Sequence, residues 1–233
     1  MSRRALVVGC LTALLAASPA VAVAPVVEQM VVFRDGDAVT RTVAAKQVRV
    51  RVGGRRCTAG EGTALAALVR SRVGRLGLRD FGSCSTRARD SAGLFVSSIK
   101  GERNRGQDGW VYKVGNRGAT AGAADPGGAF GRGRLKRGQR VTWFFCRLRG
   151  GGCQRTLALE ARRDPGTVSV TVRGYDDEGR GVPVQGATVS AGSVTSLTGA
   201  DGRATLALSP GRHRLVAEKD GLVRSFAERV VVP

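Results

Sequence analysis

The sequence predicts a mainly β protein with one short helix, arranged as two small units. Short stretches of alternating apolar and polar residues recur along the chain, and Gly, Asp, Asn and Pro separate them. Only residues 63–73 place apolar residues at helical spacing. A length of 233 residues suits two small domains as well as one large one, and a polar break at residues 161–166 favours two.

The first 24 residues have the features of an export signal. Arg3 and Arg4 precede an apolar run, and small residues lead to Ala22 and Ala24, after either of which a signal peptidase would cut. The run is too short to span a membrane, and no later stretch could do so. Cys10 lies too early in the run for a lipoprotein signal. We therefore expect a bacterial protein that is secreted or held at the cell envelope.

The mature chain is strongly basic. The full chain has 38 Lys and Arg against 18 Asp and Glu, and loss of Arg3 and Arg4 with the signal lowers the net charge from +20 to about +18. Such a charge favours anionic partners, such as envelope polymers, acidic glycans, membrane surfaces or nucleic acid. The alternative is a solvated basic surface without a dedicated partner.

Four cysteines follow the signal, and an even number indicates disulfides in an exported protein. Cys146 and Cys153 flank a six-residue loop between two apolar runs, as at the tip of a hairpin, so we expect them to pair. That leaves Cys57 to pair with Cys84 across the predicted helix. There is no C-x-x-C motif and His213 is the only histidine, so we expect no metal site and no cofactor.

The first unit is predicted to span residues 28–161. Thr63 can cap a helix that runs through residues 64–73. Arg72, Arg75 and Arg79 are spaced three and four residues apart, and Gly77 indicates that they belong to a solvated helix end. The strands predicted in this unit cover residues 30–34, 38–43, 46–53, 78–83, 94–99, 110–114 and 141–146.

Two aromatic strands form the centre of the first unit. Trp110 and Tyr112 share one face of the earlier strand, and Trp143 lies on the later one. A Gly- and Ala-rich stretch, residues 119–133, is expected to form a long loop between them. Two interpretations stay open: the three rings form a binding surface, or they form the core, as such strand faces usually do.

A second candidate site is the basic segment that leads into the later aromatic strand. Its side chains would bind an anionic polymer or nucleic acid in a salt-sensitive way, or would lie in a solvated loop. This segment, called the basic loop below, carries Arg132, Arg134, Lys136, Arg137 and Arg140.

Residues 108–116 (D-G-W-V-Y-K-V-G-N) and 135–143 (L-K-R-G-Q-R-V-T-W) carry a resemblance to the transcobalamin-like C-terminal domain family, which covers about residues 48–145. The resemblance implies a β-grasp-like fold, with strands wrapped around one helix. Gly115-Asn116 stands where the family usually has Asn-Gly, and Gln139 where Asp is common. In the vitamin carriers this domain is half of a cobalamin site, and a helical barrel forms the other half. No such barrel is encoded here, so corrinoid binding is an alternative only.

The second unit, residues 166–233, is predicted to be a β-sandwich because short strands alternate with tight turns. The runs V-P-V-Q-G-A-T-V, T-G-A-D-G-R-A-T-L and P-G-R-H-R-L-V-A-E-K-D-G resemble carboxypeptidase regulatory-like and bacterial Ig-like surface modules. The resemblance implies an Ig-like or prealbumin-like sandwich that acts as a spacer or adhesive unit. The strands predicted here cover residues 167–173, 187–191, 203–208, 213–218 and 223–232.

The chain contains no nucleophile motif such as G-x-S-x-G, so we expect no catalysis. The predicted function is that of an exported, monomeric binding or envelope protein. Its expected partner is an anionic envelope polymer or a small extracellular ligand, which the residues do not identify. The alternatives are salt-sensitive binding of anionic polymer or nucleic acid through the basic loop, and binding of a corrinoid-type small molecule.

Overall fold

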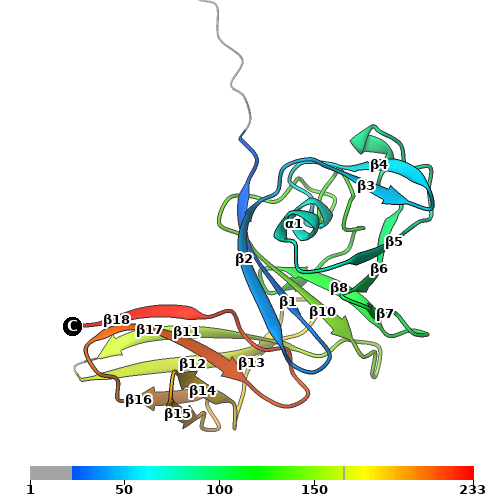
Figure 1. Cartoon of the computed structure of the whole chain (residues 1–233). Coiled ribbons are helices and arrows are strands. Elements are labelled where there is room, and N and C mark those ends of the chain that lie inside the picture. Colours follow the sequence, from blue (N-terminus) through cyan, green and yellow to red (C-terminus); the bar gives the residue numbers. More distant parts are fainter. Residues whose placement is uncertain (1–22, 165) are drawn as a thin grey trace, which may run out of the picture.

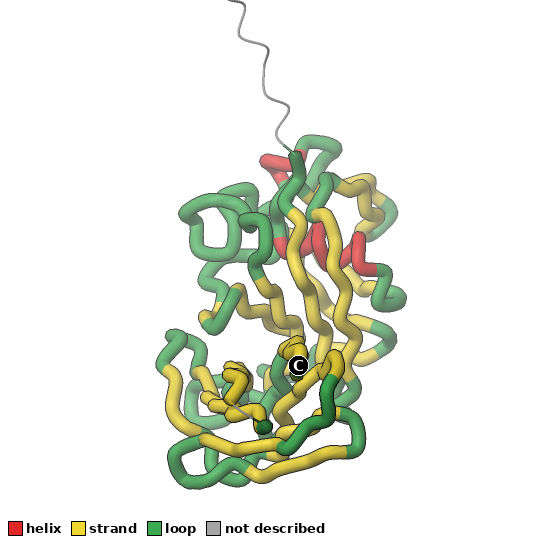
Figure 2. The backbone as a smooth tube through the Cα atoms, turned by 90° about the vertical axis from the view of Figure 1, so that its left-hand side faces the viewer, coloured by secondary structure: helices red, strands yellow, loops and turns green. Residues whose placement is uncertain are grey.

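The computed structural model describes residues 23–164 and 166–233. Most of the predicted signal peptide, including Arg3, Arg4 and Cys10, lies outside the described residues. The described chain is mainly β with one α-helix, as predicted, and its strands form several sheets. No helix in the described ranges has the length and apolar character needed to cross a membrane. Two units lie one above the other in Figures 1 and 2.

A five-stranded sheet forms the centre of the first unit. Its strands lie in the order β2-β1-β10-β8-β9, and β1 and β10 run parallel while the other neighbours are antiparallel. The β1–β2 hairpin, blue in Figure 1, runs from beside the helix down to the second unit. The strands are β1 (Val26–Val32), β2 (Ala38–Ala44), β8 (Gly109–Val114), β9 (Arg117–Gly118) and β10 (Arg140–Cys146).

Helix α1 (Ala64–Ser71) covers one face of this sheet and contacts β1 and β2. Thr63 caps it as predicted, because its hydroxyl accepts a hydrogen bond from the Ala66 amide at 3.2 Å. The helix ends at Ser71, earlier than expected, because the backbone of the following residue, Arg72, turns into the left-handed region with φ 51°. Leu65 and Leu68 are fully buried on its inner face.

Two smaller sheets complete the first unit. One is the hairpin of β3 (Val48–Val52) and β4 (Arg55–Ala59). The other has the order β5-β6-β7, and the short 3₁₀ helix η1 (Ala88–Asp90) precedes its second strand. These three strands are β5 (Leu76–Asp80), β6 (Leu94–Ile99) and β7 (Glu102–Arg103).

Both predicted disulfides are present. Cys57 on β4 is bonded to Cys84 in the segment after β5, so the two smaller sheets are tied together. Cys146, the last residue of β10, is bonded to Cys153 across a short loop. The pairing inferred from loop length is therefore confirmed.

The second unit consists of two four-stranded sheets that share one apolar core. Val168 and Val170 enter that core from the first sheet, and Leu215 and Ala217 enter it from the second. The first sheet contains β11 (Thr156–Asp164), β12 (Thr167–Tyr175), β13 (Gly181–Pro183) and β16 (Arg203–Leu206). The second contains β14 (Thr188–Ala191), β15 (Val194–Leu197), β17 (Gly211–Glu218) and β18 (Glu228–Val232).

The predicted linker at residues 161–166 is wrong, because most of it lies within a hairpin. Strand β11 continues to Asp164 and pairs with β12 along its whole length. The physical reason is the alternation that starts before the linker: Leu157 and Leu159 are buried in the core of the second unit, and Ala161 packs against it. The second unit therefore begins near Thr156.

An apolar cluster joins the two units. Met30 and Val32 of β1 and Phe144 of β10 face away from the helix and pack in one cluster with Val223 and Phe226 of the second unit. All five side chains are buried. The central sheet of the first unit is thus covered by the helix on one face and by the second unit on the other, which explains why both faces of β10 are apolar.

A buried lysine adds a polar link between the units. The Lys113 side chain on β8 is 1% exposed, and its Nζ donates to the carbonyls of Tyr175 at 3.0 Å and Asp176 at 2.9 Å. The same Nζ lies 3.2 Å from Oδ1 of Asp177. Burial lowers the pKa of Lys113, and the Asp177 carboxylate opposes that effect. Three acceptors satisfy the three donors of one ammonium group.

Candidate functional site

The three aromatic side chains predicted as a possible binding surface are buried. Trp110, Tyr112 and Trp143 are 3%, 8% and 1% exposed. Tyr112 stacks on Trp143 with ring centroids 5.0 Å apart, and Trp110 Nε1 donates to the Glu102 carbonyl at 2.8 Å. Tyr112 donates to the Ala121 carbonyl, and burial raises the pKa of its hydroxyl. An aromatic contact surface is therefore not formed by these rings, which lie in the core.

The basic loop divides into two parts. Arg140 is partly buried, and its guanidinium pairs with Glu28 at 3.0 Å and with Glu228 of the second unit. It therefore links the two units, and its charge is compensated. The remaining basic side chains are exposed and have no carboxylate partner among the described residues: Arg132, Arg134, Lys136 and Arg137.

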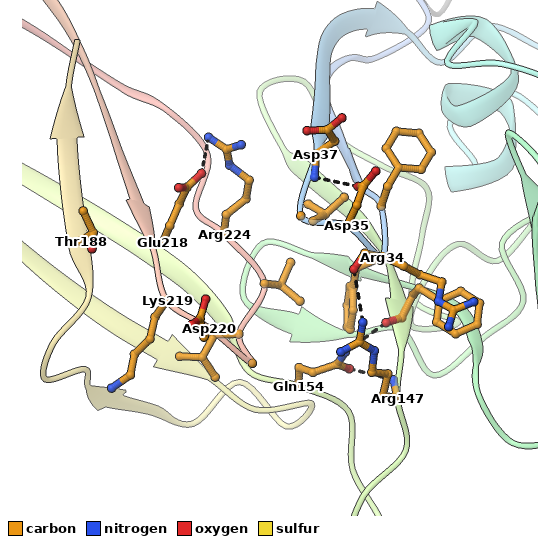
Figure 3. A pocket seen from close by; sticks show the side chains of 18 of the residues that line it. Arg34, Asp35, Asp37, Arg147, Gln154, Thr188, Glu218, Lys219, Asp220 and Arg224 are labelled. Atoms are coloured by element: carbon orange, nitrogen blue, oxygen red, sulfur yellow. Dashed lines mark hydrogen bonds and ion pairs between the residues drawn. The ribbon is translucent and has the colours of Figure 1, made fainter. Parts of the chain in front are cut away.

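A cleft of about 780 Å³ lies between the units and is called the interunit cleft below. Figure 3 shows its two walls: the β1–β2 turn and the end of β10 on one side, and the segment after β17 on the other. Its lining contains four basic residues, Arg34, Arg147, Lys219 and Arg224, and four acidic residues, Asp35, Asp37, Glu218 and Asp220.

These charges largely satisfy one another or the protein backbone. Glu218 and Arg224 form an ion pair at 2.8 Å, drawn as a dashed line in Figure 3. Arg147 donates to the Arg34 carbonyl at 3.2 Å, and the Arg34 guanidinium lies 4.9 Å above the Phe145 ring. Four charges of each sign give no net attraction for an anionic ligand, so this cleft does not explain the basic character of the chain.

A second hollow of about 450 Å³ lies on the β5-β6-β7 sheet and is called the arginine groove. Arg75, Arg79 and Arg103 line it, and no carboxylate does. All three arginines are exposed, and none has an ion-pair partner among the described residues. A positive field without compensating carboxylates attracts anions, most strongly where a hollow concentrates it.

The strand pairing explains how the groove forms. Arg79 on β5 lies opposite Phe95 on β6, whereas the neighbouring pair, Leu78 and Val96, packs against the core. The register shifts at Gly77, where an added Cβ would lie 2.2 Å from the Ser98 hydroxyl oxygen. Glycine at this position therefore leaves room for the hydroxyls of Ser97 and Ser98, which form the floor of the groove.

Two exposed aromatic rings extend the groove. Phe95 lines it and is 42% exposed, and Phe81, just after β5, is 75% exposed. The rings meet edge to face with centroids 5.8 Å apart. Exposed large apolar side chains that gather in one place often mark a binding surface. Together with the arginines they form a basic and aromatic patch on the first unit.

This patch was not predicted as a site. The sequence pattern predicts that Arg75 and Arg79 belong to a solvated helix end, but the helix ends at Ser71 and Arg79 lies on β5. The same pattern predicts strands for Phe81 and Phe95 and indicates no binding role for either ring. The available signal was the presence of two phenylalanines within an arginine-rich stretch of short predicted strands.

The third hollow and the metal-ligating side chains of the described residues give weaker candidates for a binding site. A third hollow of about 580 Å³ is lined by Glu160, Asp164, Arg162 and Arg203, so its charges are balanced. Within the ranges described, no group of three or more His, Cys, Asp or Glu side chains could hold a metal ion.

No family model, curated protein or solved structure matches this chain.

Proposed function

We propose that this chain is an exported, non-catalytic binding protein whose first unit holds an anionic polymer of the cell envelope or its surroundings. The observation that carries the proposal is the arginine groove, where Arg75, Arg79 and Arg103 lie together without a carboxylate. The interunit cleft is larger, but its charges balance. Two disulfides and a net charge of +20 for the full chain agree with an extracellular binder of anions.

The strand order supports a β-grasp assignment for the first unit. A hairpin, β1–β2, is followed by the helix, and β10 then returns to lie parallel to β1 at the centre of the sheet. That arrangement agrees with the fold implied by the transcobalamin-like resemblance. In the second unit, two facing four-stranded sheets around one core agree with an Ig-like or prealbumin-like sandwich.

We assign the second unit a supporting role in binding. Its residues Val223 and Phe226 pack against Phe144 on the face of the central sheet opposite the helix. The arginine groove lies on a different sheet, β5-β6-β7. The second unit can therefore act as a spacer while the groove stays open to a ligand.

Salt elution from immobilised polymers tests the proposal. The disulfide-bonded chain is passed over polyphosphate and over a uronic-acid polymer, and retention is measured as the salt concentration rises. A variant with Arg75, Arg79 and Arg103 changed to Gln should elute at distinctly lower salt than the wild-type chain, because fewer counterions are released on binding.

A matched control keeps the same net charge. Arg212, Arg214 and Arg229 are exposed on β17 and β18 and have no ion-pair partner among the described residues. Changing these three to Gln removes equal charge from the second unit, and retention should stay close to that of the wild type. Equal losses of retention in both triple variants would show that binding depends on net charge alone, and would refute the groove as the site.

Two alternatives have their own outcomes in the same experiment. If changing Arg132, Arg134 and Arg137 to Gln lowers retention more than the groove variant, the basic loop is the binding element. A corrinoid immobilised on the same support tests the small-molecule alternative. Salt-independent retention on the corrinoid, without retention on the polymers, would replace the proposal.

A further inference from the structure

We propose that the arginine groove and its neighbour Phe81 bind single-stranded nucleic acid, with bases against the phenylalanine rings and phosphates against the arginines. The inference rests on the proposed function in one respect, that the ligand of this groove is anionic. The ligand proposed here differs from a simple anionic polymer because it also carries planar bases, whose faces are apolar.

The exposed rings are the first argument. Phe81 is 75% exposed and Phe95 is 42% exposed, so both rings offer surface to a ligand. Proteins that bind single strands without sequence preference combine a positive groove with aromatic side chains on which bases stack. A polyphosphate or a uronic-acid polymer can satisfy the arginines, but it has no base to stack on the phenylalanines.

The strand register is the second argument. Arg79 and Phe95 are directly opposite each other on β5 and β6, which places a cation and a ring side by side on the open face of the sheet. Arg103 on β7 lies opposite Ser98 on β6, so a second cation stands across the same face. Alternation of charge and ring matches the alternation of phosphate and base along a nucleic acid strand.

The floor of the groove is the third argument. The hydroxyl oxygens of Ser98 and Ser97 lie 2.2 and 3.0 Å from the place that a Cβ on Gly77 would take, and neither has a hydrogen-bond partner among the described residues. A hydroxyl both donates and accepts, so either serine can bond to the edge of an unstacked base. In a duplex the base faces are stacked and shielded, which is why recognition by rings favours single strands.

The test compares polymers of equal charge. The disulfide-bonded chain is titrated into a labelled single-stranded oligodeoxythymidine of about 12 nucleotides, a size within the range of single-strand binding sites. Polyphosphate and a uronic-acid polymer of matched charge compete for binding. We expect the oligonucleotide to bind more tightly than either competitor and the affinity to fall as salt rises.

Substitutions separate rings from charges. Phe81→Ser should weaken oligonucleotide binding about five- to tenfold, the lower part of the range for loss of one stacked base, and should leave polyphosphate binding unchanged. Leu197→Ser is the matched control, because Leu197 is 67% exposed on β15 of the second unit. Arg79→Gln should lower the slope of log affinity against log salt by about 0.7, the value for one phosphate of a single strand.

The outcomes distinguish this inference from the proposed function. If polyphosphate binds as tightly as the oligonucleotide and Phe81→Ser changes neither, nucleic acid recognition is refuted while anion binding by the chain stands. If the uronic-acid polymer binds most tightly, the ligand is an acidic glycan and the inference fails. If none of the three polymers binds at low salt, both the inference and the proposed function fail.

Discussion

Replacing Lys113 by Met tests whether the two units are held together by the buried ammonium group. Met keeps most of the side-chain volume but cannot donate a hydrogen bond. The carbonyls of Tyr175 and Asp176 would lose donors at 3.0 and 2.9 Å, and the Asp177 carboxylate would lose a partner at 3.2 Å. We expect the substitution to destabilise the whole molecule, because these contacts join β8 to the second unit.

The magnitude follows from the geometry. Hydrogen bonds to charged groups contribute about 1.5–3 kcal/mol each, and burial of the lysine charge offsets part of that. The Asp177 side chain is 35% exposed, so water can solvate it after the substitution. We therefore expect a loss of about 3 kcal/mol, near the lower end for breaking a buried pair. In a chain of this size that corresponds to a melting temperature lower by about 6–12 °C.

Calorimetric unfolding of the disulfide-bonded chain measures this loss. Lys136→Met is the matched control, because Lys136 is exposed and makes no ion pair among the described residues. The control should change the stability by no more than about 0.5 kcal/mol. A loss in Lys113→Met that does not exceed the loss in the control would refute the role assigned to this lysine.

The pH dependence of the same difference has a definite sign. The folded-state pKa of Lys113 lies below the ordinary value of 10.5, mainly through burial. Between the folded-state pKa and 10.5, the unfolded chain binds the proton that the folded chain has released. The contribution of Lys113 to stability therefore increases as pH rises through that window. The stability difference between wild type and Lys113→Met should grow over this range, and a difference that shrinks would contradict the direction of the shift.

Three further predictions concern the first unit. The double variant Cys57→Ser, Cys84→Ser opens a loop with a sequence separation of 27 and should lose about 3.5 kcal/mol in urea denaturation; a loss below about 1 kcal/mol would contradict this. Thr63→Ala removes the helix cap and should cost about 1 kcal/mol, while Thr63→Ser should retain most of the stability. Trp110→Phe should cost about 1 kcal/mol more than Trp143→Phe, because only the Trp110 indole has a hydrogen-bond partner in the described structure; equal losses would count against that reasoning.

Much of the secondary structure could be predicted because burial of one strand face leaves an alternating pattern. Strand β6 spans Leu94–Ile99 as predicted, and β8 and β10 begin one residue earlier than expected. Strand β4 (Arg55–Ala59) was missed because it opens with two exposed arginines and has no alternation. Its pairing with β3 depends on the Gly53-Gly54 turn, where both residues have positive φ.

The site could not be predicted to the same extent, because exposure depends on pairing partners that are distant in sequence. Trp143 and Phe95 are both aromatic strand residues, yet Trp143 is 1% exposed and Phe95 is 42% exposed. The difference is set by what covers each sheet, which a local pattern does not encode. Arg140 is the opposite case, a predicted binding residue whose charge is already paired. The sequence groups it with the basic loop, but Glu228, 88 residues away, pairs with it in the interface between the units.

The parallel pairing of β1 with β10 has a consequence for the order in which the chain can fold. Glu28 on β1 and Arg140 on β10 are register partners 112 residues apart. Strand β1 therefore lacks its partner at the centre of the sheet until β10 has been synthesised. Contacts of such high sequence separation slow folding, because the entropy of closing the intervening chain is lost before the pairing stabilises it. The central sheet of the first unit therefore closes only after Cys146, the last residue of β10, has been synthesised.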